Sequence, residues 1–248
     1  QVLFDLKGNE EVLLDQAKAD KKFIPPSQHK KLFADVTASL VDSPVVHKEN
    51  LYVDYNAERL LPYMLSTQGP KLAAGDINND GMEDFYLGAS ANEARHLYVQ
   101  TKSGFAVTKQ DVFDSDKEKE DAGSAFFDVD NDGDVDLLVA SGGYQYDQGS
   151  SLLAARLYVN DGKGNYAKGK MPDVFTNASC VSAADIDKDG FTDVFIGGRG
   201  VASDYGKSGR SYLLHNDKGV LIDKTPELLK EPGMVTDAAW NDLNGDAY

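Results

Sequence analysis

Acidic and amide side chains alternate in short loops of the sequence, and their spacing suits the binding of a metal ion by oxygen ligands. The first such loop spans residues 76–84 and has Gly81 at its sixth position, where a sharp turn can use a positive φ. Calcium takes about six to eight oxygen ligands, which include main-chain carbonyls. The loop therefore predicts a calcium site. Its predicted ligands are Asp76, Asn78, Asp80, Asp84 and the carbonyl of Met82.

Two further loops repeat the whole pattern, and a fourth repeats part of it. In the fourth copy Ala247 stands where the glycine is expected, and the closing acid would lie beyond Tyr248. The sequence predicts about three calcium ions and leaves the fourth site open. Three ions would change the formal charge from −16 to −10, since each adds two charges. The predicted ligands are Asp128, Asp130, Asp132, the carbonyl of Asp134 and Asp136; Asp185, Asp187, Asp189, the carbonyl of Phe191 and Asp193; and Asp242, Asn244 and Asp246.

Two other interpretations of these loops compete with a metal site. An EF-hand needs a glutamate at its twelfth position and a helix after it. The corresponding residues are Leu87, Val139 and Ile196, so the EF-hand pattern is not met. Ordinary hairpin turns with solvated acids are the other alternative, and the repetition of the complete pattern favours metal sites over such turns.

The elements that must position these loops form a repeat. The first aspartates of the four loops lie 52, 57 and 57 residues apart (76 to 128, 128 to 185, 185 to 242). Each loop is followed by a short apolar run and then by a hairpin pattern with Gly, Asn or Asp at the turn, at residues 96–107, 156–167 and 211–222. Each such unit is predicted to form four short strands. We therefore predict an all-β propeller of four-stranded blades, with about three to four blades in this chain.

The two ends of the chain do not follow the repeat. Residues 1–30 end in a stretch with paired prolines and are predicted to be the end of a preceding module plus a linker. Residues 31–248 are predicted to hold the propeller blades. Because the last residue falls inside the fourth loop and a propeller must close to hide its strand edges, we expect a fragment of a longer propeller.

The composition argues against a nucleic-acid partner, a disulfide within the chain and a transmembrane segment. The chain has 41 acidic and 25 basic residues, so a nucleic acid would be repelled. Cys180 is the only cysteine, which excludes a disulfide within the chain. The sequence has no apolar run of the length that predicts a transmembrane segment.

The loops and the runs DFYLGAS, DLLVASGG and DVFIGGRG that follow them resemble the FG-GAP, or VCBS, repeats of integrin α-subunit propellers and of bacterial surface proteins. The resemblance spans about residues 69–248. The wider sequence, including residues 47–76 and GMVTDAAWNDLNGD, resembles bacterial relatives of the cartilage acidic protein family, and residues 1–23 resemble the end of an ASPIC/UnbV module. These resemblances imply an extracellular, bacterial cell-surface or periplasmic location and a calcium-dependent structural or binding role.

We therefore expect a non-enzymatic adhesion or ligand-binding module with a protein or glycan ligand. The candidate contact residues are Tyr144, Tyr146 and Gln148, for which packing in a solvated loop is the alternative. The competing function is a calcium-dependent polysaccharide-processing enzyme such as a lyase, which needs a base beside a charge-neutralising group. Sequence alone pairs none of its candidate bases, and no nucleophile or phosphate-loop motif is present. The histidines are His29, His47, His96 and His215.

Overall fold

A computed structural model describes residues 33–41, 46–69 and 71–245. The chain divides into two compact units, Gln1–Val36 and Thr37–Tyr248. In the first unit the described residues, 33–36, have no regular secondary structure. The module predicted at residues 1–30 lies outside the described residues. All of the sheets in the described residues belong to the second unit.

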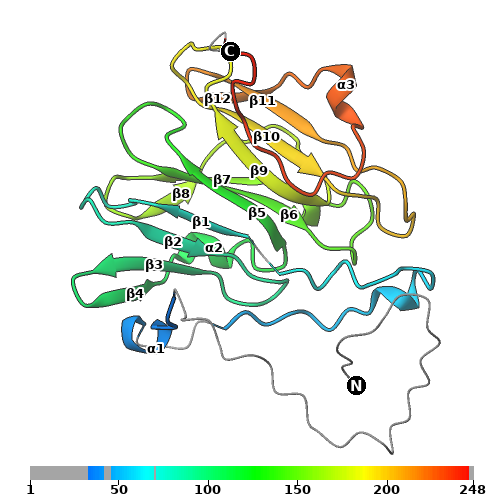
Figure 1. The fold of residues 1–248 in the computed structure, drawn as a ribbon, viewed down its shortest axis with the longest axis horizontal. Helices are drawn as coiled ribbons and strands as arrows, with labels where there is room; N and C mark the ends of the chain where they lie inside the picture. Colours follow the sequence, from blue (N-terminus) through cyan, green and yellow to red (C-terminus); the bar gives the residue numbers. More distant parts are fainter. Residues whose placement is uncertain (1–32, 42–45, 70, 246–248) are drawn as a thin grey trace, which may run out of the picture. The chain divides into compact units, whose positions relative to one another are not determined.

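The second unit holds three antiparallel sheets of four strands each (Figure 1). In each sheet the strands follow one another in chain order, so every sheet is a simple meander. This arrangement confirms the prediction of an all-β, propeller-like chain with four-stranded blades. The strands are β1 (Leu72–Gly75), β2 (Asp84–Leu87), β3 (His96–Thr101) and β4 (Gly104–Thr108); β5 (Glu120–Phe127), β6 (Asp136–Gly142), β7 (Arg156–Asn160) and β8 (Tyr166–Lys168); and β9 (Ala178–Ala184), β10 (Asp193–Gly198), β11 (Tyr212–Asp217) and β12 (Val220–Asp223).

Helical segments in the described residues are short and lie in the connections. They are α1 (Thr37–Leu40), η2 (Asp54–Asn56), α2 (Asp111–Asp114), η3 (Ser151–Leu153) and α3 (Glu227–Lys230). None of the described helices has the length and apolar character needed to cross a membrane.

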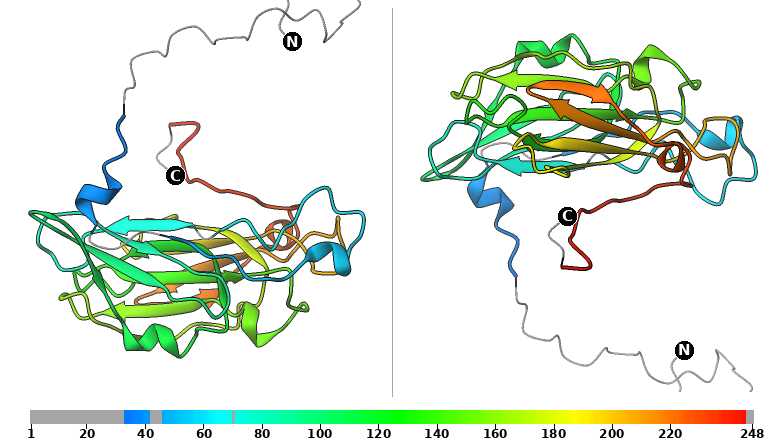
Figure 2. Two further views of the ribbon diagram at one scale, coloured as in Figure 1. Left: turned by 90° about the horizontal axis from the view of Figure 1, so that it is seen from below. Right: turned by 90° about the horizontal axis from the view of Figure 1, so that it is seen from above.

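The second sheet lies between the first and the third, with β5 beside both β1 and β9 (Figures 1 and 2). Alternate residues of β6 point into different interfaces. Leu137 packs in a core with Tyr86 of the first sheet, whereas Leu138 packs in a core with Val194 of the third. Because both faces of β6 are covered, every residue of this strand is buried. Residues 137–140 of this strand are therefore all apolar and do not alternate with polar residues.

A buried ion network centred on Asp121 links the first two sheets. The carboxylate of Asp121 lies 2.9 Å from Arg95 Nε and 2.8 Å from Arg156 Nη2. It also accepts hydrogen bonds from the Tyr86 hydroxyl and the backbone N–H of Ala89, both at 2.9 Å. Such buried charges are tolerated only when they are paired and hydrogen-bonded. The network joins the first two sheets at the edge that lies away from the acidic loops.

Candidate metal centres in the acidic loops

The three complete acidic loops connect the first strand of each sheet to its second, so they lie at corresponding edges of the three sheets. All three loops share one turn. The fourth residue has a positive φ, namely 57° at Asn79, 60° at Asn131 and 61° at Lys188. The sixth residue is a glycine with a larger positive φ of 84° to 95°, which a residue with a Cβ rarely adopts. The sequence period therefore corresponds to one repeated loop conformation.

The first aspartate of each loop binds the backbone of the same glycine. Its Oδ2 accepts a hydrogen bond from the glycine N–H across the turn, and this bond curls the loop around the carboxylate. The distances are 2.7 Å from Gly81 to Asp76, 2.9 Å from Gly133 to Asp128, and 3.0 Å from Gly190 to Asp185.

The last aspartate of each loop is 1% exposed and joins the loop to the sheet. One of its oxygens accepts from the N–H of the second loop residue, and the other accepts from an N–H in the third strand. In Asp84 and Asp136 each carboxylate oxygen keeps a further lone pair for a metal ion. The bonds from the second loop residue are 3.1 Å long from Ile77 to Asp84, 2.9 Å from Val129 to Asp136, and 3.2 Å from Ile186 to Asp193. The bonds from the third strand are 2.6 Å long from Gln100 to Asp84, 2.8 Å from Asn160 to Asp136, and 2.8 Å from Asn216 to Asp193.

The residues predicted to add a main-chain carbonyl sit directly after the glycines. Their backbone N–H groups donate to the fifth loop residue, so the peptide is held in a fixed orientation. Ligation by their carbonyl oxygens stays a prediction. The distances are 2.9 Å from Met82 to Asp80, 3.0 Å from Asp134 to Asp132, and 2.8 Å from Phe191 to Asp189.

The second loop concentrates negative charge without a counter-charge from its own residues. Asp128, Asp130 and Asp136 can each place one carboxylate oxygen within 4.8 Å of the others. Burial raises the pKa of Asp136 to about 6, and the charges of Asp130 and Asp132 add to this rise. Asp128 Oδ1 is buried and has no hydrogen-bond partner among the described residues. An all-oxygen donor set with an orphaned acceptor fits a hard divalent cation.

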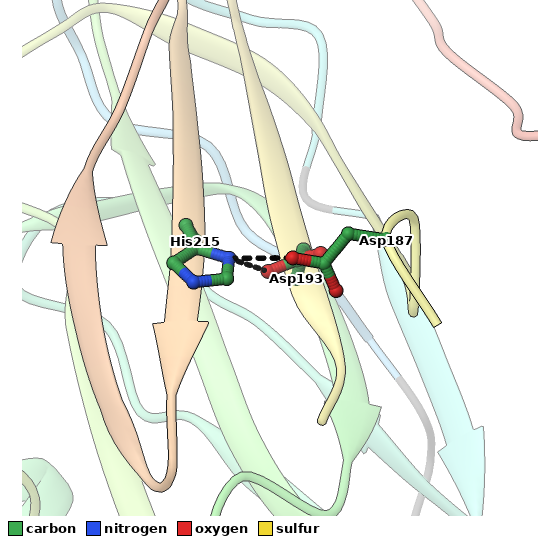
Figure 3. A group of neighbouring side chains, drawn as sticks. All are labelled: Asp187, Asp193 and His215. Carbon is green, nitrogen blue, oxygen red and sulfur yellow. Dashed lines mark hydrogen bonds and ion pairs between the residues drawn. The ribbon is translucent and has the colours of Figure 1, made fainter. Parts of the chain in front are cut away.

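The third loop contains a comparable acidic group, and it also lies beside a histidine. Asp185, Asp187 and Asp189 can bring one oxygen each within 4.8 Å of the others. His215 Nδ1, on β11, lies 3.1 Å from Asp193 Oδ1 and 3.5 Å from Asp187 Oδ2 (Figure 3). An imidazole beside the acids distinguishes this loop from the other two in the described part of the chain.

The fourth loop is described only in part. The N–H of Gly245 donates to Asp242 Oδ1 at 2.7 Å, and the φ of Gly245 is 74°. Gly245 thus shares the left-handed conformation of the fourth residue in the complete loops. Asp246 lies outside the described residues, so a metal site formed by Asp242, Asn244 and Asp246 stays a prediction.

Sequence reasoning missed three residues that surround the loops. It treated His215 as one of several scattered histidines, and it did not single out Asn160 or Asn216. Both asparagines are buried at the end of a third strand, next to a loop. The sequence does contain a signal for the two asparagines, because an Asn-Asp pair recurs at residues 160–161 and 216–217, before the hairpin turns of the second and third sheets.

The two other histidines in the described residues, His47 and His96, do not join the acidic loops. His47 Nε2 lies 3.0 Å from Glu49 Oε1. His47 and His96 both line a hollow of about 80 Å³. That volume is well below the roughly 300 Å³ at which ligand pockets usually begin. His29 lies outside the described residues.

Comparison with known proteins agrees with the repeated geometry. The model of the FG-GAP-like repeat matches residues 76–139 and again residues 128–196, and these matches cover the three complete loops. No curated protein matches the sequence. Residues 76–196 are therefore similar to FG-GAP-like repeats.

Proposed function

We propose that this chain is a calcium-binding, non-enzymatic ligand-binding or adhesion module that works outside the cell, at a bacterial surface or in the periplasm. The observation that carries the proposal is the second loop. There the buried Asp128 Oδ1 has no hydrogen-bond partner in the part of the chain that the structure describes, and it lies beside Asp130 and the buried Asp136. Leaving a buried acceptor unpaired costs about 1–3 kcal/mol, which a bound cation would offset.

The oxygen donors of the three loops suit calcium better than a softer ion. In the first two loops the ligands would be the aspartates, Asn78 and the carbonyls of Met82 and Asp134. In the third loop they would be the aspartates and the carbonyl of Phe191. Bound calcium would neutralise carboxylates that repel one another at short range. The loops would then become rigid supports for the edges of the three sheets.

The ligand-binding part of the proposal is supported by the FG-GAP-like repeats, which form propeller-type modules with this kind of role. The structure adds a physical reason for it. The acidic loops occupy one edge of the sheets, and the other edge carries the longer connections, including residues 143–155. Longer connections on a rigid scaffold are where binding surfaces usually lie.

Isothermal titration of calcium into chelator-treated protein tests the metal proposal. We expect one ion for each complete loop, three in all. The double variant Asp128→Asn and Asp130→Asn should bind one ion fewer, because the second loop then lacks two anionic ligands. Asp111→Asn changes an exposed aspartate outside the loops and should leave the stoichiometry unchanged. Absence of binding heat in the wild-type chain would overturn the proposal.

A further inference from the structure

His215 lies beside the acidic loop of the third sheet, and its ring points toward two carboxylates of that loop (Figure 3). Its Nδ1 is 3.1 Å from Asp193 Oδ1 and 3.5 Å from Asp187 Oδ2. One atom from each of the three residues lies within 4.8 Å of the other two. An imidazole nitrogen and two carboxylate oxygens thus come together in one cluster, the His215 group, which consists of Asp187, Asp193 and His215.

The position of His215 holds a different kind of residue in the other two sheets. The third strands can be aligned by the backbone N–H that each donates to the last aspartate of its loop. The residue before this N–H is His215 in the third sheet, Val159 in the second and Val99 in the first. Both valines are partly buried and pack against hydrophobic cores. The third sheet therefore presents a nitrogen atom to its loop where the first two present an apolar side chain.

An ion can reach the His215 group from solvent. The side chains of His215 and Asp187 are 29% and 48% exposed. The Asp193 side chain is only 1% exposed, and the backbone N–H groups of Ile186 and Asn216 hold its carboxylate in place. The group therefore combines one fixed, buried carboxylate with two side chains that are open to solvent.

The spacing of the group fits a small ion that binds nitrogen as well as oxygen. Zinc binds histidine nitrogen and carboxylate oxygen at about 2.0–2.2 Å, so neighbouring ligand atoms of a tetrahedral site lie about 3.3–3.6 Å apart. The two distances from His215 Nδ1, 3.1 and 3.5 Å, are close to this separation. Imidazole suits zinc and its neighbours among the transition metals, whereas calcium takes oxygen ligands. The chemistry of the group therefore favours a transition metal.

We propose that the His215 group binds a transition-metal dication of the zinc class, so that the third loop accepts a metal that the other two loops do not. The protein ligands would be His215 Nδ1, Asp187 Oδ2 and Asp193 Oδ1. The ion would take the place of the proton that the imidazole and the carboxylates share. Because Asp187 and Asp193 are also ligands of the proposed calcium site in this loop, the two ions would exclude each other there. The inference itself does not require calcium binding.

Calorimetric titration of zinc chloride into protein stripped of metal tests the site, with His215→Val as the variant that gives the third sheet the residue of the other two. The loss of an outer partner alone costs about 10–100-fold in metal affinity, so the loss of a direct ligand should weaken zinc binding at least tenfold. His47→Gln is the control, because His47 lies beside only one carboxylate, that of Glu49, and its replacement should leave this affinity unchanged. No zinc binding by the wild type, or equal affinities for the wild type and His215→Val, would overturn the proposal.

A second variant and a spectroscopic measurement separate direct ligation from a loss of folding. Asp187→Asn removes an anionic ligand but keeps an acceptor for the N–H of Asp189, so it should weaken zinc binding at least tenfold and leave the unfolding midpoint nearly unchanged. In nitrogen-detected NMR of the imidazole rings, saturating zinc should shift the Nδ1 resonance of His215 more than that of His96. An unshifted His215 Nδ1 would contradict direct ligation.

Calcium titrations distinguish this inference from the proposed function. His215→Val keeps every predicted calcium ligand and should bind three calcium ions, whereas the wild type saturated with zinc should bind two. Three calcium ions bound in the presence of zinc would contradict the proposed zinc ligands. Zinc binding that His215→Val abolishes, together with an absence of calcium binding, would contradict the proposed function and leave the zinc site standing. Calcium binding without zinc binding would do the reverse.

Discussion

The side-chain amide of Asn216 donates a hydrogen bond of 2.8 Å to the carbonyl oxygen of Val129, which lies in the acidic loop of the preceding sheet. Asn160 makes the same bond one sheet earlier, to the Ile77 carbonyl at 2.7 Å. Each asparagine also donates to a carbonyl of its own loop, at Thr192 in the case of Asn216. Every acidic loop that precedes another sheet is thus tied to that sheet by a buried asparagine.

The first prediction concerns this bond. Asn216→Ala should lower the free energy of unfolding by about 2–3 kcal/mol, because it leaves the carbonyls of Val129 and Thr192 unpaired in the interior. Urea denaturation followed by circular dichroism measures the change. Gln100→Ala is the matched control, since Gln100 has the same position in the first sheet and makes no such bond among the described residues. A loss below about 0.5 kcal/mol for Asn216→Ala would contradict the role of the bond.

The second prediction concerns Asp116 and pH. Burial alone would raise the pKa of this carboxyl, but hydrogen bonds from Lys119 and Lys168 outweigh it and lower the pKa to about 2. Because the folded pKa lies below the unfolded value of about 3.9, the contribution to stability is complete above that value and is lost as the pH falls toward 2.

Asp116→Asn should therefore cost about 2 kcal/mol at pH 7, and its difference from the wild type should shrink between pH 4 and pH 2. Unfolding measured in chelator across this range follows the difference without interference from bound metal. Asp111→Asn, which changes an exposed carboxylate, should show no such convergence. A penalty for Asp116→Asn that is constant down to pH 2 would refute the assignment.

The third prediction concerns the ion network around Asp121. Asp121→Asn leaves Arg95 and Arg156 without an anionic partner in the interior, and such losses cost about 3–5 kcal/mol. Chemical denaturation should show a loss in this range. Lys207→Met is the control, because it breaks only the exposed pair with Asp204 and should change stability by less than about 1 kcal/mol. If both variants lost equally little, the network would not stabilise the fold.

The sequence predicted the sheets and loops because their signals are local. A positive φ at Gly133, the acids around it and the apolar run from Leu137 onward all lie within one short segment. The repeat spacing then placed the same loop in each sheet. This local information was sufficient for the four-stranded units and for the positions of the candidate ligands.

The features that sequence reasoning missed depend on contacts between distant segments. His215 reaches Asp193 from another strand, and Asp121 meets Arg156 at a separation of 35 residues. Neither pairing follows from spacing, because strand register and the packing of neighbouring sheets bring the residues together. The position of Tyr144 has the same origin. Tyr144 was singled out from its loop composition, but its position against Gly200 depends on the fold.

The claim that the acidic loops hold calcium is tested most directly by thermal unfolding of the wild-type chain in calcium and in chelator. Binding to the folded state alone stabilises it by about 2.7 kcal/mol per site when the ion is at a hundred times its Kd. For a chain of this size 1 kcal/mol corresponds to about 2–4 °C, so we expect calcium to raise the midpoint by at least about 5 °C. Identical midpoints in calcium and in chelator would contradict the account.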